Sequence, residues 1–129
     1  MMNGIVIRDA HFPGRAPIEA YGNGGFRFAG MSHRGSLLCV PSGIYGWAPE
    51  TADGITPDSL ARVGEEAGEI DVLLIGVGAV PFPLDPAAAG ALRAMGVRFD
   101  TMNTGAAVRT FNVMIAEERR VAAALLAID

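Results

Sequence analysis

The stretch Asp71-Val-Leu-Leu-Ile75 limits the fold more than any other part of this 129-residue sequence. Its apolar residues run without interruption, as they do in strands that are buried on both faces of a parallel sheet. Each face of such a sheet needs a covering layer. From about residue 56 onward, helical and extended patterns alternate, which predicts crossover connections on a parallel sheet. We therefore predict a three-layer α/β fold in which residues 1–129 form a single domain.

The second half of the chain carries start and stop signals for helices. The expected helices cover residues 57–67, residues 86–95 and the stretch that follows Asn103 or Thr104; the expected strands cover residues 97–99 and 120–128. Asp85 precedes a proline at the first helical position, which is the pattern of a capped helix start. The alanine-rich stretch 120–128 also suits a helix by propensity alone, so its type stays open at this point.

The first half reads as short strands joined by tight turns. The expected strands cover residues 4–8, 18–21, 26–28, 36–40 and 44–47. Gly22-Asn-Gly-Gly25 is a strong turn signal between two of them, and Pro41 ends another because proline cannot donate to a ladder. Residues 31–35 are expected to be a connection. The N-terminal half is therefore predicted to be rich in antiparallel β-structure.

Charge and composition argue against several classes of protein. The formal net charge is −4 and the ten basic residues are scattered, so no basic patch predicts nucleic-acid binding. No apolar run reaches the roughly 18 residues that span a bilayer, and the first residues show no secretory signal pattern. We therefore expect a cytoplasmic protein that is not embedded in a membrane.

The sequence offers little support for metal or nucleophilic chemistry. His11 and His33 stand in different connections without a metal-ligand spacing, and a metal site needs three or four converging ligands. Cys39 lies in an apolar run and is expected to be a buried small hydrophobe rather than a nucleophile. We predict no metal and no cofactor. The catalytic residues are unknown, and a non-enzymatic role is favoured over an enzymatic one.

Gly76-Val-Gly78 follows a strand, as the glycines of a dinucleotide-binding loop would, and Asp100 stands 24 residues after Gly76. The rest of that fingerprint is missing. Pro81 occupies the place of the third glycine, and Asp85 at the helix start would repel a phosphate. We predict instead that Gly76 and Gly78 permit positive φ where the chain leaves the sheet.

Hydrogen-bonding side chains gather where the strand expected at residues 97–99 gives way to the third helix. In open α/β sheets, ligands bind in the crevice at the carboxyl ends of the strands. A candidate ligand cleft therefore lies between residues 76–82 and 101–112. Its candidate residues are Gly76, Gly78, Thr101, Thr104, Arg109, Thr110, Asn112 and Arg119. The alternative is that these side chains cap the helix and make polar contacts along it.

Arg119 stands between the third helix and the last apolar stretch, and it has two candidate roles. In the structural role, its guanidinium pairs with a carboxylate such as Asp71 or Asp100, or it caps helix carbonyls. In the other role, it points into the cleft and holds an anionic ligand. We favour the structural role, which predicts that removal of the side chain lowers the melting temperature.

Five segments of the chain together resemble one known family. They are Gly35-Ser-Leu-Leu38, Trp47, the run from Asp71 to Gly78, Met102-x-Thr-x-Ala-Ala-Val-Arg-Thr-Phe-Asn112, and Glu118-Arg-Arg-Val-Ala-Ala-Ala-Leu125. Over nearly its whole length the sequence is similar to the Mth-type domain of unknown function, a family that includes a mitochondrial complex I assembly factor. The resemblance implies a three-layer Mth-like fold whose central mixed sheet has its last strand, residues 120–128, antiparallel to its neighbours, plus a β-hairpin-rich start.

The resemblance also bears on function. It implies no known enzymatic activity, and the mitochondrial relative is an assembly factor that acts through protein partners. The expected function is therefore a non-catalytic protein-interaction or assembly module, for instance for a respiratory or membrane complex. The alternative is a protein or enzyme that binds a small-molecule ligand in the candidate cleft. The sequence identifies neither the partner nor the ligand.

Overall fold

The computed structural model describes residues 11–129, so the strand expected at residues 4–8 lies outside the described residues. The strands are β1 (Phe12–Pro13), β2 (Ile18–Gly22), β3 (Gly25–Phe28), β4 (Met31–Arg34), β5 (Ser36–Val40), β6 (Gly43–Trp47), β7 (Val72–Gly76), β8 (Phe99–Met102) and β9 (Val121–Leu125). The helices are α2 (Ala61–Glu65), α3 (Pro86–Ala94) and α4 (Thr104–Ala116), with the 3₁₀ turns η1 (Ala52–Gly54), η2 (Asp58–Leu60) and η3 (Ala67–Glu69).

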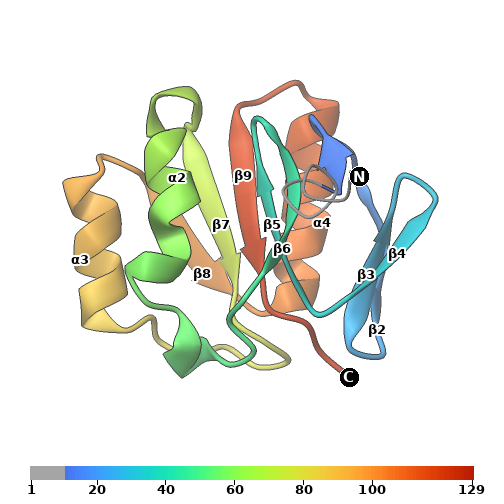
Figure 1. The fold of residues 1–129 in the computed structure, drawn as a ribbon, viewed down its shortest axis with the longest axis horizontal. Helices are drawn as coiled ribbons and strands as arrows, with labels where there is room; N and C mark the ends of the chain where they lie inside the picture. The colour runs from blue at the N-terminus through green and yellow to red at the C-terminus, as the bar shows by residue number, and fades with distance from the viewer. Residues whose placement is uncertain (1–10) are drawn as a thin grey trace, which may run out of the picture.

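These elements form two sheets in a three-layer arrangement (Figure 1). The large sheet has the order β1-β6-β5-β9-β7-β8, and β2, β3 and β4 form a separate small sheet. Within the large sheet, β7 is parallel to β8, whereas β6 is antiparallel to both β1 and β5. The small sheet is antiparallel throughout. The predicted mixed sheet and antiparallel N-terminal half are therefore confirmed.

The position of β9 corrects the expectation for the last strand. β9 is antiparallel to β5, as expected, but it is parallel to β7. The reason is the connection: α4 carries the chain from the carboxyl end of β8 back to the end of the sheet at which β7 and β8 begin. A strand that follows such a crossover runs in the same direction as the strand before it.

The core has two parts, one on each face of the large sheet. On one face, Leu73 and Ile75 of β7 join a cluster that packs against α2 and α3. On the other face, Leu74 joins a cluster that includes residues of α4 and of the small sheet. Figure 1 shows α2 and α3 on one side of the large sheet and α4 with β2–β4 on the other. Both faces of β7 are covered, as the uninterrupted apolar run predicts.

Two of the predicted helix starts have the expected caps. The Asp85 carboxylate accepts a hydrogen bond from the Ala87 N–H at 2.9 Å, and the Asn103 side chain accepts one from the Ala106 N–H at 2.8 Å. The helix expected at residues 57–67 is instead divided among η2, α2 and η3. Gly64 and Gly68 lower the helix propensity of this stretch, which explains the short pieces.

Two strands differ from the sequence prediction. Residues 31–35, expected as a connection, contain β4, whose side chains are mostly exposed and so show no apolar alternation. The strand expected at residues 97–99 lies instead at Phe99–Met102. β8 is an edge strand with one partner, so its exposed side can carry the polar residue Asp100, and hydrophobic pattern alone misplaces it.

None of the helices in the described part of the chain is long and apolar enough to cross a membrane.

Candidate functional site

The two segments predicted to line a cleft do meet at the carboxyl ends of β7 and β8, but they meet in a packed contact. Thr104, the first residue of α4, is fully buried. Its hydroxyl donates a hydrogen bond to the Leu126 carbonyl at 2.8 Å and accepts one from the Gly78 N–H at 3.1 Å. The Thr104 N–H donates to the Gly78 carbonyl at 2.8 Å. Thr104 thus joins the chain after β7, the start of α4 and the chain after β9, an arrangement that we call the Thr104 junction.

The two glycines of the predicted cleft have different reasons to be glycine. Gly78 has a φ angle of +115°, as predicted. The φ angle of Gly76 is not positive, so the prediction is wrong for Gly76. A Cβ atom on Gly76 would lie 2.9 Å from the Thr104 Cα and 3.2 Å from the Leu125 Cδ2. Gly76 therefore permits the close approach of α4 to β7. The Gly78 and Thr104 N–H groups, which a phosphate would need, are already bonded within the protein.

Asn112 connects α4 to the small sheet. Its side-chain oxygen accepts a hydrogen bond from the Ile18 N–H at 2.8 Å, and its side-chain nitrogen donates to the Ile18 carbonyl at 2.9 Å. Both backbone groups at the start of β2 are therefore satisfied by one amide. The Asn112 side chain therefore makes a contact between α4 and the small sheet, and not a contact along the helix.

We expect Asn112→Ala to lower the free energy of unfolding by about 1–3 kcal/mol, because two partly buried hydrogen bonds are lost and the Ile18 backbone groups lose their partner. Urea denaturation measures this change. Thr110→Ala, on the same helix, is the control and should change the free energy by less than about 0.5 kcal/mol. Equal effects of the two variants would contradict the role of the Asn112 amide.

The remaining candidate residues do not converge on the Thr104 junction. Thr101 and Thr110 are half-buried, and Arg109 is exposed on α4. A Cβ atom on Gly105 would lie 2.5 Å from the Tyr21 hydroxyl and 3.4 Å from Arg109 Nη1. Tyr21 therefore crosses α4 at Gly105, and Arg109 lies on the side of the helix that faces the small sheet. Arg119 lies beyond the other end of α4.

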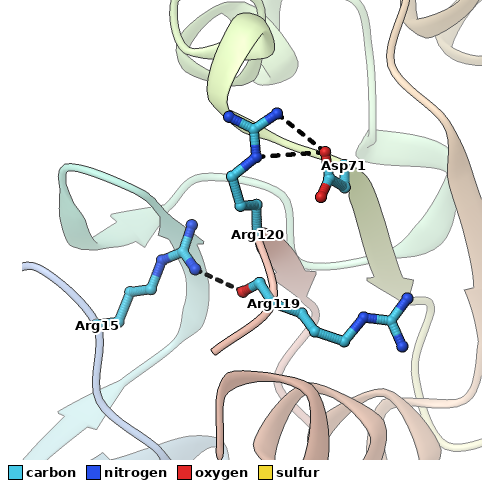
Figure 2. A network of polar contacts seen from close by, with 4 residues as sticks. All are labelled: Arg15, Asp71, Arg119 and Arg120. Carbon is cyan, nitrogen blue, oxygen red and sulfur yellow. Dashed lines mark hydrogen bonds and ion pairs between the residues drawn. The ribbon is translucent and has the colours of Figure 1, made fainter. Parts of the chain in front are cut away.

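Asp71, a carboxylate expected to pair with Arg119, pairs instead with the neighbouring residue Arg120 (Figure 2). Arg120 donates to Asp71 Oδ1 from Nε at 3.3 Å and from Nη2 at 3.0 Å. The hydrogen bond to Asp71, and then the charge of Asp71, raise the pKa of Arg120. The Arg119 guanidinium lies 3.9 Å from Glu117, both side chains being more than half exposed, while its backbone oxygen accepts from Arg15 Nη1 at 2.7 Å. The predicted Arg119 pairing with Asp71 is therefore wrong.

We expect Arg120→Ala to lower the melting temperature slightly and Arg119→Ala to leave it unchanged. The Arg120 ion pair is exposed, so salt should screen it, and the difference between Arg120→Ala and the parent protein should disappear in 1 M sodium chloride. Thermal denaturation at low and high salt measures both effects. A larger loss of stability in Arg119→Ala than in Arg120→Ala would restore a structural role for the Arg119 side chain.

The rings of the two histidines, which the sequence places in separate connections, lie next to each other in a tilted arrangement, with centroids 4.7 Å apart and an interplanar angle of 48°. His33 Nε2–H donates to the Ser36 carbonyl at 3.1 Å. Burial, with a smaller contribution from His11, lowers the pKa of His33 against the opposing effect of the Ser36 bond. Cys39 is buried, as predicted, and burial raises its pKa to about 12. Within residues 11–129, no three His, Cys, Asp or Glu side chains are placed to hold a metal ion.

A surface loop after β7 exposes large apolar side chains. Residues 79–84, Ala-Val-Pro-Phe-Pro-Leu, form what we call the proline loop. Val80 is 67% exposed and Phe82 is 51% exposed, more than most large apolar side chains of the described chain. The alternation of proline with large apolar residues in this stretch is the sequence signal from which such an exposed loop can be predicted.

The proline loop lines a hollow of about 360 Å³, which we call the loop hollow. Its wall residues are Glu50, Thr51, Ala52, Asp53, Val77, Gly78, Ala79, Val80, Phe82 and Leu126. Residues 76–82 therefore do border a concave surface, but they share its lining with residues 50–53 and Leu126, and not with residues 101–112. The loop hollow combines exposed apolar side chains with the carboxylates of Glu50 and Asp53.

Known proteins with a similar sequence have a similar fold. The model of the protein family of unknown function DUF498/DUF598 matches residues 18–126. A crystal structure described as an outer membrane protein of Bartonella henselae is 55% identical, covers 92% of this chain and 100% of that chain, and superposes with a TM-score of 0.86. A Bordetella pertussis protein described as an Mth938-like domain is 27% identical, covers 87% of this chain and 85% of that chain, and has a TM-score of 0.75.

A named relative comes from an animal. The NADH dehydrogenase (ubiquinone) 1 alpha subcomplex assembly factor 3 of Xenopus tropicalis is 31% identical over 109 residues, which are 84% of this chain. The match spans 60% of the length of that relative. The resemblance to the Mth-type domain family inferred from the sequence is therefore confirmed.

Proposed function

This chain belongs to the DUF498/DUF598 family of proteins of unknown function, and we propose that it is a protein-interaction module that acts in the assembly of a larger complex. The relative from Xenopus tropicalis is named as an assembly factor for NADH dehydrogenase. A respiratory complex is therefore the class of target that we propose. This chain matches 60% of the length of that relative, and the proposal concerns the function of the matched part.

The exposure of the proline loop is the observation that carries the proposal. Burial of a valine or phenylalanine side chain is worth roughly 1.5–3 kcal/mol, so the exposure of Val80 and Phe82 forgoes stability that a partner could recover. Pro81 and Pro83 restrict the backbone between them. A restricted loop loses less conformational entropy when a partner binds. The loop therefore suits a docking surface for another protein.

A small-molecule function in the predicted cleft has no comparable support. Thr104 packs against Gly76 where that cleft would open, and the Thr104 hydroxyl already has two partners. We therefore do not propose a ligand there.

We expect the double variant Val80→Ser/Phe82→Ser to lose a partner that affinity capture recovers with the parent protein from its native cells. The melting temperature should change little, because both side chains are largely exposed. Val113→Ser is the matched control, since Val113 is 57% exposed and lies on α4. It should keep the partner. Loss of the partner in Val113→Ser but not in the double variant would contradict docking through the proline loop.

A further inference from the structure

The charges of this protein are unevenly distributed along the chain. Residues 50–71 contain seven carboxylates (Glu50, Asp53, Asp58, Glu65, Glu66, Glu69 and Asp71) and a single arginine, Arg62. Residues 11–49 contain three arginines and one carboxylate, Glu19, which lies 3.6 Å from Arg27. The stretch that leads to β7 therefore carries most of the excess negative charge of the described chain.

Part of this negative charge borders the apolar docking surface. Glu50 and Asp53 line the loop hollow together with Val80 and Phe82, and no lining residue is basic. Neither carboxylate belongs to an ion pair within residues 11–129. One oxygen of Asp53 accepts the Thr51 hydroxyl, which leaves its other oxygen available. The loop hollow thus combines exposed apolar side chains with two carboxylates that have no ion-pair partner within residues 11–129.

We infer that the partner docks through a basic segment that carries an apolar anchor side chain. The anchor lies over the loop hollow against Val80 and Phe82, and arginine or lysine neighbours of the anchor reach Glu50 and Asp53. This inference rests on the proposed function, because it names the chemistry of the partner at the same surface. The size of the hollow, about 360 Å³, suits a few side chains of one segment.

Charge also argues against a second copy of this chain as the occupant. The chain has a net charge of −4, and two loop hollows placed face to face would bring their carboxylates together. Like charges at an interface oppose association, whereas a basic partner is attracted over roughly 8–10 Å at physiological salt. The complementary partner is therefore a different, basic chain.

Photo-crosslinking in the cells of origin tests the inference. Phe82 is replaced by the photoreactive analogue p-benzoylphenylalanine, and the crosslinked peptide is identified by mass spectrometry. We expect a segment of a different protein in which arginine and lysine outnumber acidic residues around an apolar side chain. An acidic or uncharged segment, or a second copy of this chain, would overturn the inference.

Charge reversal tests the role of the Glu50 and Asp53 carboxylates at the loop hollow. Glu50→Lys with Asp53→Lys should reduce the crosslink yield at position 82 about tenfold. The matched control is Glu65→Lys with Glu69→Lys, which makes the same change in net charge on exposed residues outside the loop hollow. The control should reduce the yield less than threefold. Equal reductions in the two variants would assign the effect to net charge and overturn docking at the loop hollow.

A second crosslinking position separates the inference from the proposed function. The same analogue is placed at Val113, which is exposed on α4. Capture of an acidic partner segment at position 82 overturns the basic partner and leaves the assembly role standing. Capture at position 113 alone overturns docking at the proline loop. No protein captured at either position contradicts the proposed function itself.

Discussion

Thr104→Val should lower the free energy of unfolding by about 3 kcal/mol. Valine has nearly the same shape as threonine but no hydroxyl, so the bonds to the Leu126 carbonyl and from the Gly78 N–H are both lost. Thr104 is fully buried, and water cannot readily replace the missing partner. Each unsatisfied buried group costs about 1–3 kcal/mol. Urea denaturation measures the change, and a fall of about 10 °C in the melting temperature should accompany it.

Thr104→Ser separates the hydroxyl from the methyl group. Serine keeps both hydrogen bonds and loses one buried methyl group, which should cost about 1 kcal/mol. A similar loss in the serine and valine variants would show that packing, and not the hydroxyl, holds the Thr104 junction together.

Gly76→Ala should lower the free energy of unfolding by about 2–3 kcal/mol. The new Cβ atom would lie 2.9 Å from the Thr104 Cα and 3.2 Å from the Leu125 Cδ2. The first of these atoms is backbone at the start of α4, so relief of the contact requires the helix to move away from β7. Overpacking of this kind typically costs about 1–3 kcal/mol. Denaturant unfolding gives the change directly.

Gly90→Ala is the control for Gly76→Ala. Gly90 lies within α3, is exposed, and has no neighbouring atom within 4 Å of an added Cβ. Alanine favours a helix over glycine by up to about 1 kcal/mol, so this variant should be more stable than the parent. If Gly76→Ala were equally well tolerated, the close approach of α4 to β7 would not be the reason for a glycine at position 76.

Signals that act over a few residues predicted the fold well. Asp85 and Asn103 both cap helices as expected, because a capping side chain bonds to N–H groups of its own first turn. The strand expected at residues 36–40 has the same bounds as β5. β4 was not predicted because it is defined by its backbone pairing with β3, and its exposed side chains show no alternating apolar pattern.

The candidate site was harder to predict, because its geometry depends on distances between elements. Gly76 and Thr104 were correctly predicted to lie at the same end of the sheet, because the carboxyl ends of neighbouring parallel strands lie together. It could not tell an open crevice from a closed one, which depends on how closely α4 approaches β7. Likewise, no local pattern decides whether Arg119 or Arg120 faces Asp71. That choice depends on the register between β9 and β7.

The central place of β9 has a consequence for the order of events during synthesis. β9 separates β5 from β7, and it pairs with residues such as Leu38 and Leu74, which precede it by a long stretch of chain. The antiparallel and parallel halves of the large sheet therefore cannot join until residues 121–125 have left the ribosome. Until then, β5 and β7 each present an unpaired edge, the kind of edge that invites association with other chains.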